Sequence, residues 1–155
     1  MRAMRRKEFE MSREEALTIL RKAEYGILST AGEDGTPYGV PLNYALDGDE
    51  ILIHCALEGH KMDNIRHNSM VCFTVVGRAT LVPERSTTAY QSVIVFGKAS
   101  IVSSDEEKRE ALRMLVRRFL PPEMHKSAMK DVDEDVSKHG VIRIKIVEMS
   151  GKSRE

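Results

Sequence analysis

The residues with the most suggestive chemistry gather around one glycine. His54, Gly59, His60 and Lys61 span the end of a predicted strand and the start of a predicted short helix over 61–66. Amides at the start of a helix carry partial positive charge and a lysine adds a point charge, so this combination suits a phosphate. An ordinary loop with solvated Lys and His has the same composition and stays an open alternative.

Three histidines and a cysteine raise the question of a metal site, since His54, Cys55, His60 and His67 lie close in sequence. Successive strand residues point to opposite faces, so His54 and Cys55 cannot readily bind one ion together, and no pair of cysteines has the two-residue spacing. The same alternation argues against a Cys/His nucleophilic dyad. We therefore expect no metal. Cys55 and Cys72 both lie in apolar runs, which favours free thiols over a disulfide.

Pro41 lies inside a predicted strand, where it lacks the amide hydrogen that a central strand needs. Such a proline is tolerated at a sheet edge, at a bulge, or where the backbone turns toward something else. A planar ligand beside this segment would be such a place. A proline at a barrel edge without any ligand is the open alternative.

The elements that must position these residues follow from hydrophobic periodicity and turn signals. Ser12 and Glu15 form a capping box before a helix predicted over 13–24. Strands over 25–31, 36–46 and 50–56 are separated by turn residues and predict an antiparallel meander. Further along we expect strands over 70–81, 90–102 and 141–149 and a helix from Ser104 or Asp105 to about Leu120, while 123–139 is ambiguous between a short helix and a mobile arm.

About six strands, two or three helices and no βαβ alternation favour a mainly β fold, an antiparallel barrel with an N-terminal helix and further peripheral helices. The length of 155 residues suits one domain over 1–155. Within it we expect 1–11 to be flexible or to contact a second subunit. The glycines form neither a G-x-G-x-x-G dinucleotide fingerprint nor a P-loop.

Composition restricts the partners. Lys plus Arg number 24 and Asp plus Glu number 24, so no overall field attracts nucleic acid or an anionic membrane. Every apolar run is far shorter than the roughly 20 residues that cross a bilayer. The basic N-terminus is followed by no hydrophobic stretch of the kind found in secretion signals. These features predict a cytoplasmic protein without a membrane span.

Several segments taken in order resemble the pyridoxamine-phosphate-oxidase-like flavoproteins, and most closely their nitroimidazole-resistance reductase branch. The segments are RRKE, PYGVPLNYAL, ILIHCALEGHKMDNI, VPE, SVIVFGKA and MSGK, which together extend over nearly the whole chain. The resemblance implies a six-stranded split β-barrel and a homodimer with two FMN sites at the subunit interface. This agrees with the strand count obtained from periodicity.

The resemblance also implies a set of site residues. Backbone groups of Val40, Pro41, Leu42 and Asn43 would run beside the isoalloxazine ring. The cofactor site would also include His54, Cys55 and Gly59, with His60 and Lys61 meeting the phosphate. Tyr90, Ser92 and Val93 of the other subunit would close over the flavin.

By resemblance, the expected activity is FMN-dependent reduction of small molecules, with nitroaromatic compounds such as 5-nitroimidazoles as candidates. His54 is the best candidate acid because the ordinary pKa of histidine suits proton transfer near neutral pH. A hydrogen bond from His54 to phosphate or ribityl hydroxyls, without proton transfer, is the alternative. VPLNY replaces the basic flavin-site strand of the vitamin-forming oxidases, which argues against pyridoxamine phosphate as substrate. Gln91 stands where related chains often carry Arg, which could alter the charge preference for the substrate.

Two other functions stay open at this point. One is a flavin carrier or sensor that has no dedicated substrate. The other is a haem- or deazaflavin-binding protein built on the same split barrel.

Overall fold

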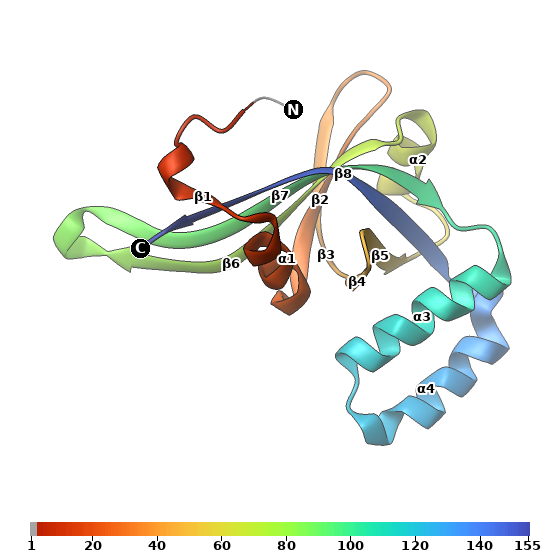
Figure 1. Ribbon diagram of the computed structural model, residues 1–155. Helices are drawn as coiled ribbons and strands as arrows, with labels where there is room; N and C mark the ends of the chain where they lie inside the picture. Colours follow the sequence, from red (N-terminus) through yellow and green to blue (C-terminus); the bar gives the residue numbers. More distant parts are fainter. Residues whose placement is uncertain (1–2) are drawn as a thin grey trace.

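The computed structural model describes residues 3–155 and contains one curled antiparallel sheet flanked by helices (Figure 1). Its strands run in the order β3-β2-β6-β7-β8-β5-β4, and β1 adds to β8. The strands are β1 (Glu10–Met11), β2 (Tyr25–Ala31), β3 (Pro37–Asn43), β4 (Ala45–Asp47), β5 (Glu50–Cys55), β6 (Met70–Val82), β7 (Thr87–Ile101) and β8 (Gly140–Arg154). The helices are α1 (Arg13–Lys22), α2 (His60–His67), α3 (Asp105–Phe119) and α4 (Pro122–Asp135), with short 3-10 turns η1 (Lys7–Phe9), η2 (Pro83–Arg85) and η3 (Val136–Lys138).

The mainly β fold with peripheral helices is confirmed, and the two end strands of the sheet explain the split of the barrel. β3 and β4 lie at opposite ends of the strand order, yet only Tyr44 separates them in sequence. The sheet therefore curls until its two edges approach each other at Tyr44. Residues 3–155 contain eight strands where the sequence predicted about six, because the short strands β1 and β4 were not predicted separately.

Two details of the predicted strands are wrong. The continuous strand expected over 36–46 breaks at Tyr44, whose side chain is completely buried in the core. The expected meander also fails, because β5 pairs with β4 and β8 and has no ladder with β3. Burying the Tyr44 ring forces the chain to turn there, which sends the residues after it to a different partner strand.

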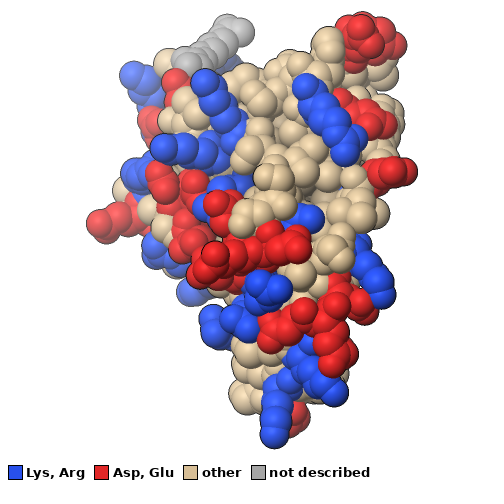
Figure 2. All heavy atoms as spheres, turned by 90° about the vertical axis from the view of Figure 1, so that its right-hand side faces the viewer, with Lys and Arg blue, Asp and Glu red and all other residues tan. Residues whose placement is uncertain are grey.

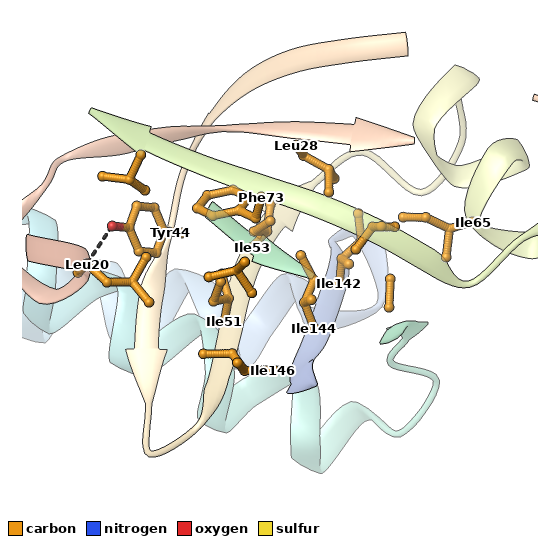
Figure 3. Close-up of a cluster of buried hydrophobic side chains, with 14 of the residues drawn as sticks. Leu20, Leu28, Tyr44, Ile51, Ile53, Ile65, Phe73, Ile142, Ile144 and Ile146 are labelled. Carbon is orange, nitrogen blue, oxygen red and sulfur yellow. Dashed lines mark hydrogen bonds between the residues drawn. The ribbon is translucent and has the colours of Figure 1, made fainter. Parts of the chain in front are cut away.

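The main core lies inside the curl, where β5 and β8 contribute rows of isoleucines (Figure 3). The hydroxyl of Tyr44 donates to the Leu20 carbonyl of α1, and its ring meets Phe73 edge to face with centroids 4.9 Å apart. The capping box predicted for α1 is present, because the Ser12 side chain accepts from the Glu15 amide and the Glu15 carboxylate accepts in return from Ser12. This helix thus seals one opening of the curl.

A second apolar cluster joins the α3–α4 hairpin to β4, β5 and β8. In Figure 1 this hairpin lies at the opposite end of the molecule from the β6–β7 turn. The ambiguous stretch 123–139 is mostly α4, which begins at Pro122. The hairpin is held by ion pairs from Arg109 and Arg113 to Asp133, at 3.1 and 2.8 Å.

Several expectations about partners and termini can be compared with residues 3–155. Cys55 and Cys72 are free thiols, as expected. None of the helices described is long and apolar enough to traverse a bilayer. Acidic and basic side chains intermingle on the face in Figure 2, in keeping with the net charge of zero. Of the N-terminal segment 1–11, residues 1 and 2 lie outside the described residues, and β1 pairs with β8.

Candidate functional site

Strand β3 forms an open edge of the sheet. One side of β3 pairs with β2 over its whole length, and in the described residues no strand pairs with its other side. Pro41 therefore stands in an edge strand, as its missing amide hydrogen requires. Val40 and Leu42 pack partly against the core, whereas Pro41 and Asn43 are exposed. This edge leaves backbone groups free to meet a ligand.

The start of α2 forms a second part of the site. Gly59 precedes the helix with a φ of 125°, a conformation that side chains with a Cβ rarely adopt. No side chain caps α2, and of its first-turn amides that of Met62 donates to the Gly59 carbonyl at 2.8 Å, which leaves the amides of His60 and Lys61 for an anion. His60 is exposed and Lys61 half-buried at this helix start. The arrangement has the features of an anion-binding site.

A ring contact joins these two parts. The rings of Tyr38 on β3 and His60 on α2 lie 4.2 Å apart between centroids. Asn64 of the same helix is buried, and its amide donates to the Thr30 hydroxyl on β2 at 2.9 Å. The start of α2 is therefore fixed against the end of β3 at which Tyr38 lies. Sequence reasoning found His60 but gave no role to Tyr38.

At the other end of β3, His54 meets a second histidine. His54 is exposed on β5 while its neighbour Cys55 is buried, which confirms that the two side chains point to opposite faces. Nε2 of His54 lies 3.0 Å from Nδ1 of His139, and the rings are nearly perpendicular. Although the side chain is partly exposed, desolvation of the ring lowers the pKa of His54 below its usual value, and the charge of His139 lowers this pKa further.

These histidines face a cavity of about 470 Å³ between β3, β5 and the α3–α4 hairpin. Pro41, Leu42 and Asn43 form its β3 wall. The helices supply a largely apolar wall, and the ionisable residues that line the cavity are His54, His139 and Asp131. The remaining lining residues are Leu112, Leu115, Val116, Phe119, Leu120, Ala128 and Val132. Cavities of this size and composition hold small organic molecules.

The remaining predicted site residues lie elsewhere in the chain. Cys55 packs in the core with its sulfur 3.7 Å from that of Met62, and burial raises the pKa of its thiol. Tyr90 and Ser92 are half-buried on β7, and Val93 is fully buried, so only its backbone can meet a ligand. Ser92 lines a separate cavity of about 500 Å³ on the outer sheet face. Within one chain, therefore, the β7 residues do not join His54.

Sequence reasoning missed His139 and the helical wall of the cavity. His139 comes just before β8, and the register pairs Val141 of that strand with His54. Pairing between two strands that are distant in sequence brings the two histidines together, and no local sequence pattern reveals this strand pairing. For the helical wall, the apolar periodicity of α3 was a usable signal, but the partner of that apolar face was not known.

The residues present fit a flavin with a single phosphate. The open edge of β3 offers backbone groups along a flat ring, and the α2 start offers amides and Lys61 to one phosphate. The five strand residues from Tyr38 to Leu42 span about 13 Å, a distance that an extended mononucleotide can bridge. By contrast, no group of three or more His, Cys, Asp or Glu side chains within residues 3–155 could hold a metal ion.

Comparison with known proteins places this geometry in context. A reductase from Streptomyces rimosus subsp. rimosus, named for 5a,11a-dehydrotetracycline and 5a,11a-dehydrooxytetracycline, is 28% identical over an alignment of 114 residues that covers 67% of this chain and 78% of the relative.

Solved structures share the fold. A protein from Bacteroides thetaiotaomicron assigned as a candidate 5-nitroimidazole antibiotic resistance protein has a TM-score of 0.77 and 24% identity, covering 92% of this chain and 85% of that one. The flavocytochrome Anf3 from Azotobacter vinelandii has a TM-score of 0.81 and 20% identity, covering 99% of this chain and 72% of that one. These two likenesses concern the fold alone.

A family profile settles the relationship. The profile described as pyridoxamine 5'-phosphate oxidase matches residues 12–153, which include the β3 edge, the α2 start and both histidines of the cavity. The chain therefore belongs to the pyridoxamine 5'-phosphate oxidase family, a family of flavin-binding proteins of the oxidoreductase type.

Proposed function

We propose that this protein binds FMN and catalyses the flavin-dependent reduction of small molecules, with nitroaromatic compounds among its substrates. One observation carries the proposal. A single edge strand, β3, extends from the start of α2 at Gly59, which has the features of an anion-binding site, to the cavity that His54 lines. A cofactor with a phosphate at one end and a reactive ring at the other would lie along this strand.

The phosphate would lie at the start of α2. There Lys61 supplies a positive charge, and the uncapped amides supply hydrogen-bond donors. His60 adds a donor next to Tyr38. A single helix start with one lysine suits one phosphate group, which favours FMN over a dinucleotide.

The ring would lie against the outer edge of Val40 to Asn43. Val40 and Leu42 are anchored in the core by their side chains, so the backbone beside them is held in place. Asn43 is fixed as well, because its side-chain amide donates to the Glu24 carbonyl at 2.8 Å. A rigid edge of this kind orients a flat ligand without further ordering of the protein.

His54 would donate a proton to the substrate. When bound, reduced FMN supplies a hydride, and a nitro group that takes up this hydride and one proton becomes a nitroso group with release of water. His54 lines the same cavity as Pro41, Leu42 and Asn43 and is the side chain that we assign to deliver that proton. The alternative role of His54, a hydrogen bond to the cofactor alone, predicts binding without a contribution to rate.

The second subunit would complete the site. Tyr90 and Ser92 are accessible on β7 but lie apart from His54 in one chain, which is the arrangement that a shared interface site requires. Ile94 on the same outer face is 38% exposed, and Val76 on the neighbouring strand is 55% exposed. Apolar side chains grouped on a sheet face in this way favour burial against another subunit.

The descriptions of two similar proteins guide the choice of substrates to test. The Streptomyces rimosus relative is named as a reductase of a polycyclic small molecule. The Bacteroides thetaiotaomicron protein is connected by its description to 5-nitroimidazole resistance. Both descriptions concern those proteins, and they give nitroaromatic compounds priority among the substrates to test.

Two measurements test the function. The absorbance of the purified protein identifies the cofactor, because an oxidised flavin absorbs in the blue, whereas a haem gives a Soret band. Release of the cofactor and mass analysis then distinguish FMN from FAD and from a deazaflavin. Any cofactor other than FMN would refute the first half of the proposal.

The second measurement is anaerobic reoxidation. The bound flavin is reduced with dithionite and then mixed with a 5-nitroimidazole, and its absorbance is followed in a stopped-flow instrument. We expect reoxidation that is faster than with buffer and that yields one reduced nitro product for each two electrons. A rate equal to that with buffer for every nitro compound would leave a flavin carrier or sensor as the function.

A further inference from the structure

The cavity beside His54 differs from the surroundings of an anion site. No Lys or Arg belongs to its lining, and Asp131 is its carboxylate. Six of its thirteen lining residues are leucine, valine or phenylalanine side chains of the α3–α4 hairpin. Burying an anion against a carboxylate and apolar groups without a cation is costly. The lining therefore selects a neutral, mostly apolar ligand.

The contact between the two histidines is built into the strand register. Gly140 pairs with Cys55 at the end of the β5–β8 ladder, so His139, the residue before Gly140, lies just beyond the end of this ladder. A Cβ at Gly140 would lie 2.4 Å from the Ala56 carbonyl oxygen. Only glycine permits this approach of the two backbones, which brings His139 beside His54.

The hydrogen bond between these rings has a chemical consequence. It joins Nε2 of His54 to Nδ1 of His139, and one of the two atoms must carry the hydrogen. Nε2 of His54 is thereby occupied. The nitrogen of His54 that stays free to exchange a proton with a ligand is Nδ1. Without His139 the ring could turn about its side-chain bonds and present either nitrogen.

We infer that His139 is the positioning residue of an acceptor subsite in this cavity, where it orients His54 toward a neutral, mostly apolar acceptor. The inference rests on the proposed function for its redox reaction, but the site and the orientation of the ring stand on the geometry described above. The α3–α4 hairpin would limit the size of the acceptor. The hydrogen bond between the two histidines would determine that Nδ1 of His54 is the nitrogen available to the acceptor.

The first experiment tests the ligand class by binding alone. The FMN-loaded protein is titrated with metronidazole, a neutral 5-nitroimidazole, and with 4-nitrobenzoate, an anion of similar size, while chemical shifts of the protein are recorded. We expect metronidazole to bind at least tenfold more tightly and to shift signals of Val116 and Val132. Val116→Arg, at a half-buried lining position, should abolish this binding, and Ala128→Arg, also at a half-buried lining position, provides a second variant. Equal or tighter binding of the anion would overturn the ligand class.

The second experiment tests the role of His139 in the same protein. His139→Leu removes the hydrogen-bonding ring, and His139→Asn keeps a polar atom near the position of Nδ1. We expect His139→Leu to slow reoxidation of the reduced flavin by metronidazole about tenfold with FMN affinity unchanged, and His139→Asn to recover most of the rate. The matched control is His67→Leu, at an exposed position at the end of α2.

A spectroscopic readout separates positioning from a general structural effect. Nitrogen chemical shifts of the His54 ring report its tautomer, and we expect one dominant tautomer in the wild type and a mixture in His139→Leu. An unchanged tautomer together with an unchanged rate would overturn the role of His139. If wild-type flavin is not reoxidised by any acceptor, the proposed function fails, while the titration and the tautomer still decide the inference.

Discussion

Lys61 is the residue whose charge decides the phosphate end of the proposed site. It stands at the start of α2, where no side chain caps the helix. Lys61→Ala should weaken FMN binding by about 1 to 3 kcal/mol, because removal of a charged hydrogen-bond partner typically costs this much. Equilibrium titration of the apoprotein measures the loss. Lys126→Ala, on the exposed side of α4, is the matched control and should bind FMN as the wild type does.

His54 should affect the rate more than it affects binding. His54→Ala should slow reoxidation by a nitro compound by about 100-fold, within the usual range for a general acid, and change FMN affinity less than threefold. Burial and His139 both lower the pKa of His54, so the charged form becomes populated only below the ordinary histidine pKa of about 6.5. The reoxidation rate should therefore rise as pH falls through this lowered pKa. A variant with weak FMN binding and an unchanged rate would make His54 a ligand of the cofactor.

At the scale of elements, Tyr44 couples α1 to the place where β3 ends and β4 begins. Its hydroxyl donates to the Leu20 carbonyl, and burial raises its pKa to about 12. In the unfolded chain this tyrosine ionises near pH 10, so the unfolded state loses its proton first and the free energy of unfolding falls between pH 10 and about 12. Tyr44→Phe should remove this part of the alkaline loss.

The neutral-pH effect of Tyr44→Phe follows from the same hydrogen bond. The variant should lower the free energy of unfolding by about 1 kcal/mol, the usual contribution of one hydrogen bond. Denaturant titrations at pH 7.5 and pH 10.5 measure both effects. Tyr25→Phe is the control, since Tyr25 is 60% exposed. If the two phenylalanine variants have the same pH dependence, Tyr44 does not couple these elements in the way described.

Local patterns were sufficient for the elements that carry the flavin site. The capping box of α1, the alternation of β2 and the glycine before α2 were all visible in the sequence, and a sheet edge was one of the three places that the missing amide hydrogen of Pro41 allowed. These features depend on neighbouring residues only. The start of α2 and its suitability for a phosphate could therefore be predicted from the sequence. In the structure this helix start lies beside Tyr38 of β3.

Features that depend on distant partners could not be predicted. β8 continues to Arg154, beyond the alternating apolar residues, because β7 supplies hydrogen bonds along its polar end. α4 has Val132 as its buried residue and is held by α3 through Asp133, so its own periodicity is weak. His139 reaches His54 only through the β5–β8 register. In each case the determining contact comes from another part of the chain.

At the scale of the whole molecule, the outer face of the sheet is the face that points away from the core inside the curl. The register places Ile27 of β2, Thr74 of β6 and Ile94 of β7 side by side, and Ile27 is 40% exposed. Ser92 of the same strand lies next to Ile94 on this face. Burying the face in a dimer would bring Ser92 and Tyr90 to the cofactor of the partner. Dimerisation and cofactor binding should therefore be coupled.

A charge in the centre of this face tests the coupling. Ile94→Glu should convert the proposed dimer into a monomer, because a carboxylate buried opposite its own copy is strongly unfavourable. Since each FMN would lose the residues of the second subunit, cofactor retention should fall at least tenfold in the same variant. Sedimentation velocity and the ratio of flavin to protein absorbance measure the two effects together. Met124→Glu, at a half-exposed position on α4, should change neither quantity. A monomeric wild type that retains one FMN per chain would show that each site is complete within a single subunit.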